Sequence, residues 1–463
     1  MRSISDVSLL VNDAKDENGD PLFDDTIKDP FLSPKYSDAV VIALKEYGFE
    51  IMSIRLFVDL LKSDLKSANS KMRGGAMTEE WHSRVARLLS NFLNNNLGIR
   101  SLQMIPLRDG RWTSCEEGPV YLPATGDVKI PAPLDLRVLD SAAIQNPDRR
   151  TLFKQLGVSE ATTAQVRQSI NTAFGAGKSI ANKIILKFLI YLYLTHQTNV
   201  HTREQYRNVW VRTKDKKAYY THSTPVYLPG TDHPYSPESL LSVPGTAPSF
   251  PIHLLKDLFF KGGPAQPHIF HPSWKVWLVS FIGIHERFSL LSPGGNTLSE
   301  PFLWVFNDHP DKFLGLFEHL WLHERKRLLD NPSLVSKIKD LSAKHLCKVN
   351  FLPKLKNTWL PYPHLQELVQ RYMEHPDQFP FLKVESDETD LGPRMKWNFL
   401  TKHFSVGKDD DIEFLLEILA CIERSCPDPS SIRQSQRVLN LYIAIYAKLS
   451  VANDHVAMAF RIR

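Results

Sequence analysis

The sequence has few cysteines, and their spacing excludes two common kinds of site. There are four of them, Cys115, Cys347, Cys421 and Cys426, and no two form a Cys-x-x-Cys pair. Zinc knuckles and disulfide frameworks both need several cysteines at short, paired spacings. We therefore predict a reduced protein with neither feature, which indicates an intracellular location, cytoplasmic or nuclear.

Long apolar runs are also absent. The most apolar segment, residues 184–194, is interrupted by Lys187. It is much shorter than the roughly 20 residues that span a bilayer. The chain begins Met-Arg-Ser-Ile-Ser-Asp, which lacks the apolar core of a secretory signal. We expect a buried helix at 184–194, no signal peptide and no membrane segment.

The chain has little net charge for its length. Its 56 lysines and arginines exceed its 51 aspartates and glutamates by 5, and the two signs are interspersed. This pattern predicts no strong field for nucleic acid or for a membrane surface, and leaves only local basic groups. With 463 residues, 43% of them hydrophobic, the chain is too long for one ordinary core. We expect about three or four folded units.

What the sequence does contain is a recurring hairpin. Residues 104–123 read as two short strands joined by a tight turn at Asp109-Gly110, followed by a third strand, Pro-Val-Tyr-Leu-Pro. Comparable segments are predicted at residues 208–229, at 349–361 and, more weakly, at 7–19. Because the order of parts is the same in each, the hairpin predicts an internal repeat.

Each hairpin is accompanied by a short helix with a glycine signal at its end. A glycine just past a helix can take the left-handed conformation that satisfies the last carbonyl groups. Gly48, Gly157 and Gly283 stand at such positions. In the last copy Ser405 takes this place and the glycine is displaced to Gly407. These positions recur at intervals of about one small domain.

Long amphipathic helices are predicted after each of these positions, at residues 51–66, 79–94, 166–195, 301–327, 411–422 and 432–449. Strands and helices are thus segregated within each unit, which is typical of an α+β fold. We predict a helix-rich, elongated tandem array of about four hairpin-plus-helix units. Their boundaries are 1–98 (the weakest copy), 99–200, 201–330 and 331–463. The last unit is expected to be truncated, because the chain ends inside an uncapped apolar run.

Two segments resemble ligand-binding loops but lack a required residue. Residues 175–179 end in Gly-Lys-Ser like a phosphate loop, yet Thr172 stands where that motif needs glycine, and the preceding segment is helical rather than a strand. Residues 16–25 are acidic like a calcium loop, but the first ligand falls on Ala14. We interpret the first as a break between helices and the second as a solvated turn.

One histidine pair has metal-ligand spacing. His319 and His323 lie at positions i and i+4 of a predicted helix, but Leu320 stands where zinc proteases carry glutamate. The sequence offers no third ligand. We interpret the pair as part of an amphipathic helix beside Trp321.

Basic residues gather at Lys214–Lys217, Arg325–Arg327 and around Lys348, Lys354 and Lys356. With Tyr219, Tyr220 and Trp359 nearby they suggest a surface for single-stranded nucleic acid. The same aromatic positions match Trp112, which favours core anchors instead. A nucleic-acid-associated module therefore stays an alternative. Residues 229–250 form a long Pro- and Ser-rich connection, either a linker or an exposed binding loop.

No catalytic, cofactor-binding or metal-binding residue is predicted. The chain has no Gly-x-Ser-x-Gly elbow, and nothing marks a Cys/His nucleophile pair. A stand-alone enzyme with a cleft between units is the second alternative, since clefts form at such boundaries. We predict Trp112, Tyr121, Phe153, Leu156, Phe281 and Trp397 to be buried.

Several segments together resemble a known group of large proteins. They are Ile105-Pro-Leu-Arg-Asp-Gly-Arg-Trp112, Pro119-Val-Tyr-Leu-Pro123, Asp135-Leu-Arg-Val-Leu139, Asn146-Pro-Asp-Arg-Arg150, Phe153-Lys-Gln-Leu-Gly-Val158 and Lys402-His-Phe-Ser-Val-Gly-Lys-Asp-Asp-Asp411. The combination resembles the repeat region of large fungal proteins related to sacsin and to the plant protein NO VEIN, over residues 33–448. These motifs are structural and not catalytic.

In that family an ATPase domain of the GHKL type precedes such repeats and binds ATP partly through an Asp-x-Gly-x-Gly loop. This chain has no Asp-x-Gly-x-Gly. The resemblance therefore implies the region after the ATPase, without ATP or another cofactor. It implies a non-catalytic scaffold or client-contact region of a chaperone-related protein, which works through protein partners.

Overall fold

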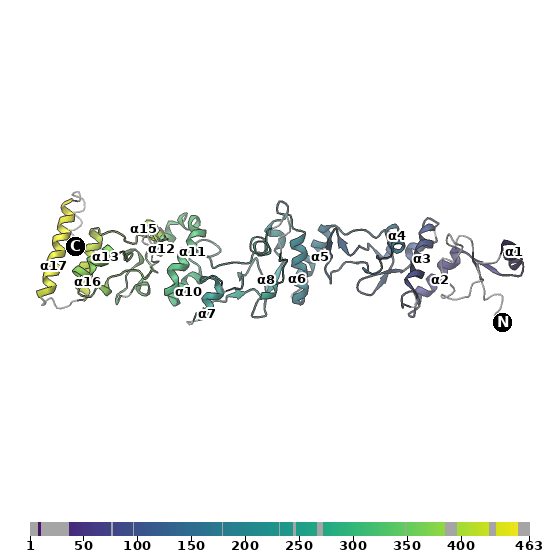
Figure 1. Cartoon of the computed structure of the whole chain (residues 1–463), viewed down its shortest axis with the longest axis horizontal. Coiled ribbons are helices and arrows are strands. Elements are labelled where there is room, and N and C mark those ends of the chain that lie inside the picture. Colours follow the sequence, from purple (N-terminus) through teal and green to yellow (C-terminus); the bar gives the residue numbers. More distant parts are fainter. Residues whose placement is uncertain are drawn as a thin grey trace. The chain divides into compact units, whose positions relative to one another are not determined.

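The computed structural model describes residues 8–10, 37–75, 77–95, 97–177, 179–230, 232–243, 247–265, 272–347, 349–384, 396–425 and 432–451. Over these residues the fold is α+β and helix-rich, with small sheets of two strands, as predicted (Figure 1). The chain divides into two compact units. One comprises Met1–Arg212, Ala218–Ser223 and Leu258–Gly283, and the other Thr213–Lys217, Thr224–Asp257 and Ile284–Arg463. The finer boundaries at 98, 200 and 330 stay predictions.

The elements up to Ile282 are β1 (Ser8–Leu10), α1 (Asp38–Glu46), β2 (Glu50–Met52), α2 (Ile54–Lys66), α3 (Glu79–Asn91), β3 (Ile105–Pro106), β4 (Trp112–Thr113), β5 (Ala124–Thr125), β6 (Val128–Lys129), α4 (Pro147–Gln155), α5 (Thr163–Gly175), α6 (Asn182–Leu194), β7 (Trp210–Arg212), β8 (Ala218–Tyr220), β9 (Val226–Tyr227), α7 (Pro237–Ser242), β10 (His253–Leu254), α8 (Asp257–Lys261), α9 (Trp274–Trp277) and a π-helical turn, η6 (Leu278–Ile282). The later ones are α10 (Glu300–Asp308), α11 (Pro310–Leu329), α12 (Pro332–Lys339), α13 (Pro363–Tyr372), α15 (Asn398–Phe404), α16 (Ile412–Ser425) and α17 (Ile432–Val451).

Two of the predicted hairpins are confirmed. β3 pairs with β4 in antiparallel register across Asp109-Gly110, and Gly110 has the positive φ of 83° that the turn requires. β7 pairs with β8 in the same way. The hairpin predicted at 349–361 is wrong over its described residues, because Leu355–Asn357 is a turn of 3-10 helix. Strand β1 pairs in parallel with β2, and the turn predicted at residues 18–19 lies outside the described residues.

The predicted helix ends are confirmed at all four positions. Gly48, Gly157, Gly283 and Ser405 have φ of 88°, 103°, 87° and 59°. After α4 the amide of Gly157 donates to Lys154 and that of Val158 to Phe153, so the last carbonyl groups are satisfied. We call α1, α4, α9 with η6, and α15 the cap helices, because each ends at one of these left-handed residues.

The chain leaves every cap helix along a short parallel bridge. The second residue after the left-handed position pairs with an earlier strand residue, and the pairs are Glu50 with Ser8, Ser159 with Tyr121, His285 with Tyr227 and Gly407 with Trp359. At four places in the chain, therefore, a left-handed residue is followed two positions later by a parallel β-bridge.

These turns give a paired prediction on stability. A Cβ at Gly157 would meet no atom within 4 Å, so Gly157→Ala adds only backbone strain, and we expect it to cost about 1 kcal/mol. Ser405→Gly relieves the strain of a non-glycine residue at positive φ and should gain about 0.5 kcal/mol. Amide hydrogen exchange in α4 and α15 measures both effects. If both substitutions changed stability by the same amount in the same direction, the assignment of Gly157 and Ser405 as left-handed helix ends would be contradicted.

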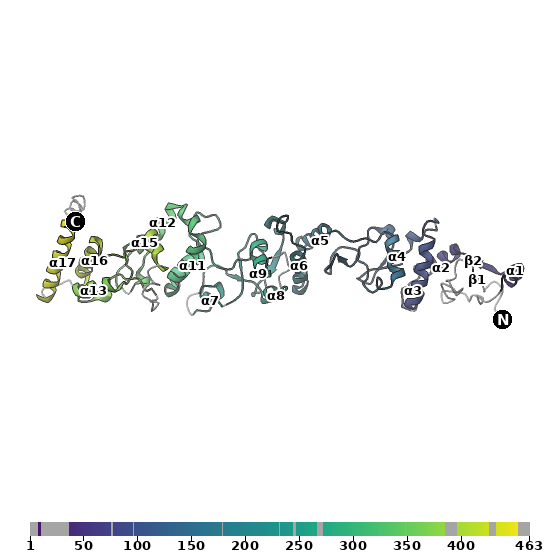
Figure 2. The same cartoon turned by 45° about the horizontal axis from the view of Figure 1, so that its top comes forward.

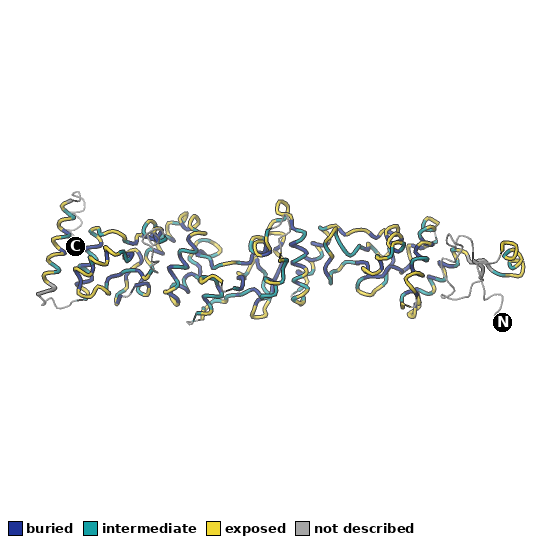
Figure 3. Tube along the Cα trace, viewed as in Figure 1, coloured by how far each residue is buried: buried dark blue, intermediate teal, exposed yellow. Residues whose placement is uncertain are grey.

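Burial follows the prediction only in part. Phe153, Leu156 and Trp397 are buried as predicted. Trp112, Tyr121 and Phe281 are only half-buried, so their predicted burial is wrong. The fully buried members of the hairpins lie on the first strand instead, at Ile105 and Trp210. β7 has two buried residues and β8 has none, whereas β4 combines the half-buried Trp112 with the buried Thr113. Figure 3 shows how buried and exposed residues are distributed along the chain.

Candidate interaction surface

The phosphate-loop and calcium-loop motifs lie partly or wholly outside the described residues. Gly175 is the last residue of α5, and a helix precedes it instead of the strand that a phosphate loop needs, as interpreted from the sequence. Lys178 and residues 16–25 lie outside the described part of the chain.

The histidine pair lies on α11, where a third histidine joins it. His233 comes from the 229–250 connection, and its ring centroid is 4.4 Å from that of His319. Burial, with further contributions from neighbouring charged groups, lowers the pKa of His319 to about 4. Nevertheless, the described residues contain no group of three His, Cys, Asp or Glu side chains that could hold a metal ion.

The described residues of the 229–250 connection also contact α11 through Tyr235. A Cβ on Gly315 of α11 would overlap the Tyr235 ring, so Tyr235 lies directly on the backbone of that helix. Its next residues form α7, in which Leu240 is fully buried. The described residues of the connection thus pack on α11, and they do not form a free binding loop.

Several of the predicted basic residues have carboxylate partners. Lys214 Nζ lies 2.5 Å from Glu238 and 3.2 Å from Asp257. Lys354 and Lys356 share Asp340 at 3.1 and 3.0 Å. A charge that is already paired attracts phosphate less strongly, so these contacts weaken the nucleic-acid alternative. Lys348 lies outside the described residues.

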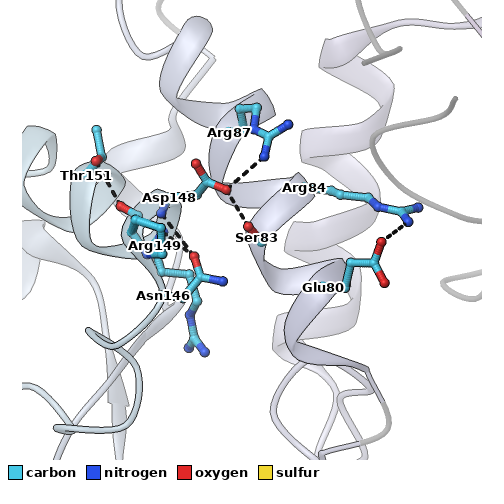
Figure 4. A network of polar contacts seen from close by, with 9 residues as sticks. Glu80, Ser83, Arg84, Arg87, Asn146, Asp148, Arg149 and Thr151 are labelled. Atoms are coloured by element: carbon cyan, nitrogen blue, oxygen red, sulfur yellow. Dashed lines mark hydrogen bonds and ion pairs between the residues drawn. The ribbon is translucent and has the colours of Figure 1, made fainter. Parts of the chain in front are cut away.

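A polar network fixes cap helix α4 on α3 (Figure 4). The Asn146 side chain accepts hydrogen bonds from the amides of Asp148 and Arg149, which starts α4 as the sequence predicts. Asp148 then accepts from Ser83 and Arg87 of α3, the latter at 3.1 Å. The N-terminal turn of α4 is thereby tied to α3 by an ion pair and a hydrogen bond as well as by packing.

Below this network lies a small cavity lined by both helices, with His82 and Val85 on α3 and Leu152 and Phe153 on α4. His82 is buried. Burial, and then the charge of Arg149, lowers the pKa of His82 to about 4, against an opposing contribution from Glu79. The lining is mostly apolar, and its one arginine, Arg149, is buried. We therefore interpret the cavity as part of the packing between α3 and α4.

His82 gives a prediction on pH. Because its folded pKa lies below the usual 6.5, the unfolded state binds the proton first as the pH falls. Stability is therefore complete above pH 6.5 and declines toward pH 4. Between pH 6.5 and 5 we expect a loss of about 2 kcal/mol from this residue. His82→Leu should remove that part of the loss, measured by hydrogen exchange of α3 amides corrected for intrinsic rates. If the His82→Leu variant showed the same pH dependence as wild type, His82 would not be the source of the loss.

A second buried polar cluster lies beside the second hairpin. Arg167 donates to the Tyr206 hydroxyl at 2.8 Å, and His196 Nδ1 lies 2.7 Å from the same oxygen. All three side chains are at most 8% exposed. The cluster has the residue types of a catalytic group, but it is closed to solvent and serves the packing of α5 and α6.

An exposed apolar face on α17 was missed by the sequence reasoning. Leu439, Tyr442, Ile443 and Tyr446 are 53%, 47%, 60% and 75% exposed and stand one turn apart on the helix. We call these four residues the α17 stripe. Leu441 and Ile445, on the other side, are buried in a cluster with α13 and α16 (Figure 2). The signal was present in the sequence, since residues 438–449 are apolar on two faces, and one neighbour covers only one face.

Elsewhere in the chain, the long helix that precedes a cap helix is packed against that cap helix. α3 is covered by α4 through the network and cavity above. α6 is covered by α9, where Tyr193 makes edge contacts with Trp274 and Trp277 at 5.3 and 5.6 Å. α11 is covered by α15, where Phe317 and Trp321 contact Phe399 and Phe404 at 5.0 to 5.6 Å. No described residue covers the α17 stripe in this way.

Among the described residues, no helix is both long and apolar enough to cross a membrane. Comparison of the chain with protein families, with curated proteins and with solved structures gave no match.

Proposed function

We propose that the chain is a non-catalytic scaffold of four α+β units that acts by protein–protein contacts. The α17 stripe carries this proposal, because four large apolar side chains stand exposed on α17, whereas α3, α6 and α11 are each packed against a cap helix. Exposed apolar patches of this kind mark surfaces that bind other proteins. The resemblance to the repeat region of sacsin-like and NO VEIN-like proteins supports the same role, as a scaffold or client-contact region.

The helices that are already covered support one kind of partner for the α17 stripe. On α3, α6 and α11 the occupant is a short helix that presents aromatic or aliphatic side chains and ends at a left-handed residue. We therefore propose that the α17 stripe receives a short amphipathic helix of the same kind. Recognition of a helix by an apolar face with anchors at i, i+3, i+4 and i+7 is a common mode of protein binding.

A photo-crosslinking amino acid in place of Tyr446 tests this proposal in the source cell. We expect adducts whose linked segment, identified by mass spectrometry, is a short amphipathic helix. The matched control is the same amino acid at Gln436, an exposed polar position on the same helix. Absence of adducts from position 446, or the same adducts from both positions, would contradict the proposal.

The four-unit organisation is part of the same proposal. It is supported by the left-handed turn and bridge that recur with one spacing at residues 48–50, 157–159, 283–285 and 405–407. Two long helices follow each turn, and the second of each pair is α3, α6, α11 and α17. In this scheme α1 is the cap helix of the first unit and α17 is the last helix of the fourth.

A further inference from the structure

We infer that the helix received by the α17 stripe is α1 of a second copy of this chain, so that copies associate head to tail. The inference rests on the proposed function and names the partner for the same surface. Within the chain each cap helix packs on the helix that ends the unit before it. Among the described residues, neither the exposed side chains of α1 nor the α17 stripe has such a packing partner.

The residue just before the left-handed turn shows the difference most directly. Leu156, Ile282 and Phe404 hold this position in the other cap helices and are 2%, 2% and 0% exposed. In α1 the position is Tyr47, which is 74% exposed. A tyrosine at a position that is buried in every other cap helix indicates a contact that the isolated chain does not make.

The rest of α1 is consistent with this contact. None of its described side chains is buried, although Val40, Val41, Ile42 and Leu44 give it apolar character. Val40 and Ile42 are 40% and 58% exposed, and α1 is almost entirely yellow in Figure 3. α4 and α15, in contrast, bury their apolar residues against α3 and α11. The exposed faces of α1 and α17 therefore have matching chemistry.

Charge is compatible with the same pairing. α17 has no acidic residue, and of its basic residues Arg437 is half-buried and Lys448 already pairs with Asp410 at 2.8 Å, whereas α1 has two acidic residues and one lysine. In the contact between α3 and α4, Arg87 of the long helix pairs with Asp148 of the cap helix. The same contact also contains the reverse pair, Arg149 of the cap helix with Glu79 of the long helix.

The contact uses different faces of the two copies and is therefore heterologous. Such a contact leaves one α1 and one α17 free in every open assembly, so it produces a series of larger assemblies or a closed ring. It predicts concentration-dependent growth beyond a dimer. A pair of complementary variants can therefore be designed, each with one end blocked.

The experiment is sedimentation velocity of the purified full chain over a concentration series. We expect wild-type protein to grow beyond dimers. Tyr47→Ser and Tyr446→Ser should each raise the concentration for half-assembly by about 30-fold, the loss typical of a buried aromatic anchor. Mixed in equal amounts, these two variants should form a dimer and nothing larger, because each retains one intact face.

The control variant is Leu352→Ser, at an apolar residue that is 70% exposed elsewhere on the chain, and it should assemble like wild type. Unchanged circular dichroism of all three variants establishes that they fold. A wild-type chain that stays monomeric, mixed variants that do not pair, or a Leu352 variant that loses assembly would each overturn the inference. If the chain is monomeric while position 446 crosslinks to a helix of another protein, the inference fails and the proposed function stands. If neither occurs, both fail.

Discussion

Trp210→Ala is expected to lower the free energy of unfolding by about 3–5 kcal/mol in the compact unit that contains Met1–Arg212. The Trp210 side chain is fully buried on β7. Its ring meets Phe174 edge to face at 5.8 Å, and its Nε1 donates to the carbonyl oxygen of Phe174 at 3.0 Å. Truncation therefore leaves a cavity and removes the partner of a buried carbonyl group, and both effects act in the same direction.

The matched control is Trp112→Ala on the first hairpin. Trp112 is only half-buried, on β4, so we expect a loss of about 1–2 kcal/mol. Hydrogen exchange of α5 and β3 amides measures each loss locally, which matters because a chain of two compact units need not unfold in one step. Equal losses, or a loss below about 1 kcal/mol for Trp210→Ala, would contradict the assignment of Trp210 as the more deeply buried tryptophan.

The features predicted correctly from the sequence are local ones. The turn at Gly110 and the helix ends at Gly48, Gly157 and Gly283 depend on the backbone conformation of one residue, and glycine adopts positive φ at little cost. Asn146 with Pro147 could likewise be placed at a helix start, because a cap and its amides lie within four residues. These signals need no knowledge of distant contacts.

The features that were missed depend on packing between distant segments. Strands of two or three residues give too short an alternation to show which side chains face inward, and so Trp112 was predicted to be buried although it is only half-buried. The segment 349–361 was predicted as a hairpin by its likeness to the others, but Leu355–Asn357 forms a turn of 3-10 helix there. Two apolar faces on α17 could be read from residues 438–449. The sequence could not show which face is covered, because that depends on the packing of α17 against α13 and α16.

The displaced glycine of the last copy leads to the second large prediction. Gly407 occupies the position that Ser159 and His285 hold in the other bridges, and it pairs with Trp359 where those pair with tyrosine. A Cβ at Gly407 would overlap the indole of Trp359. The tryptophan is buried, with Phe379 and Phe414 at 5.3 and 6.0 Å, so it has little room to move. We expect Gly407→Ala to cost about 3 kcal/mol, at the upper end of overpacking effects.

The cause of that cost can be isolated by a double-mutant cycle. If the clash with the indole is responsible, Gly407→Ala should cost much less in a Trp359→Leu background, and the coupling energy should be about 2 kcal/mol. Gly157→Ala, where no side chain approaches, should cost the same in both backgrounds. The measurement is hydrogen exchange of α15 and α16 amides. Additive effects of the Trp359 and Gly407 substitutions would show that Gly407 is required for its backbone. A large coupling would explain why this copy places glycine two residues late and leaves a serine in the left-handed turn.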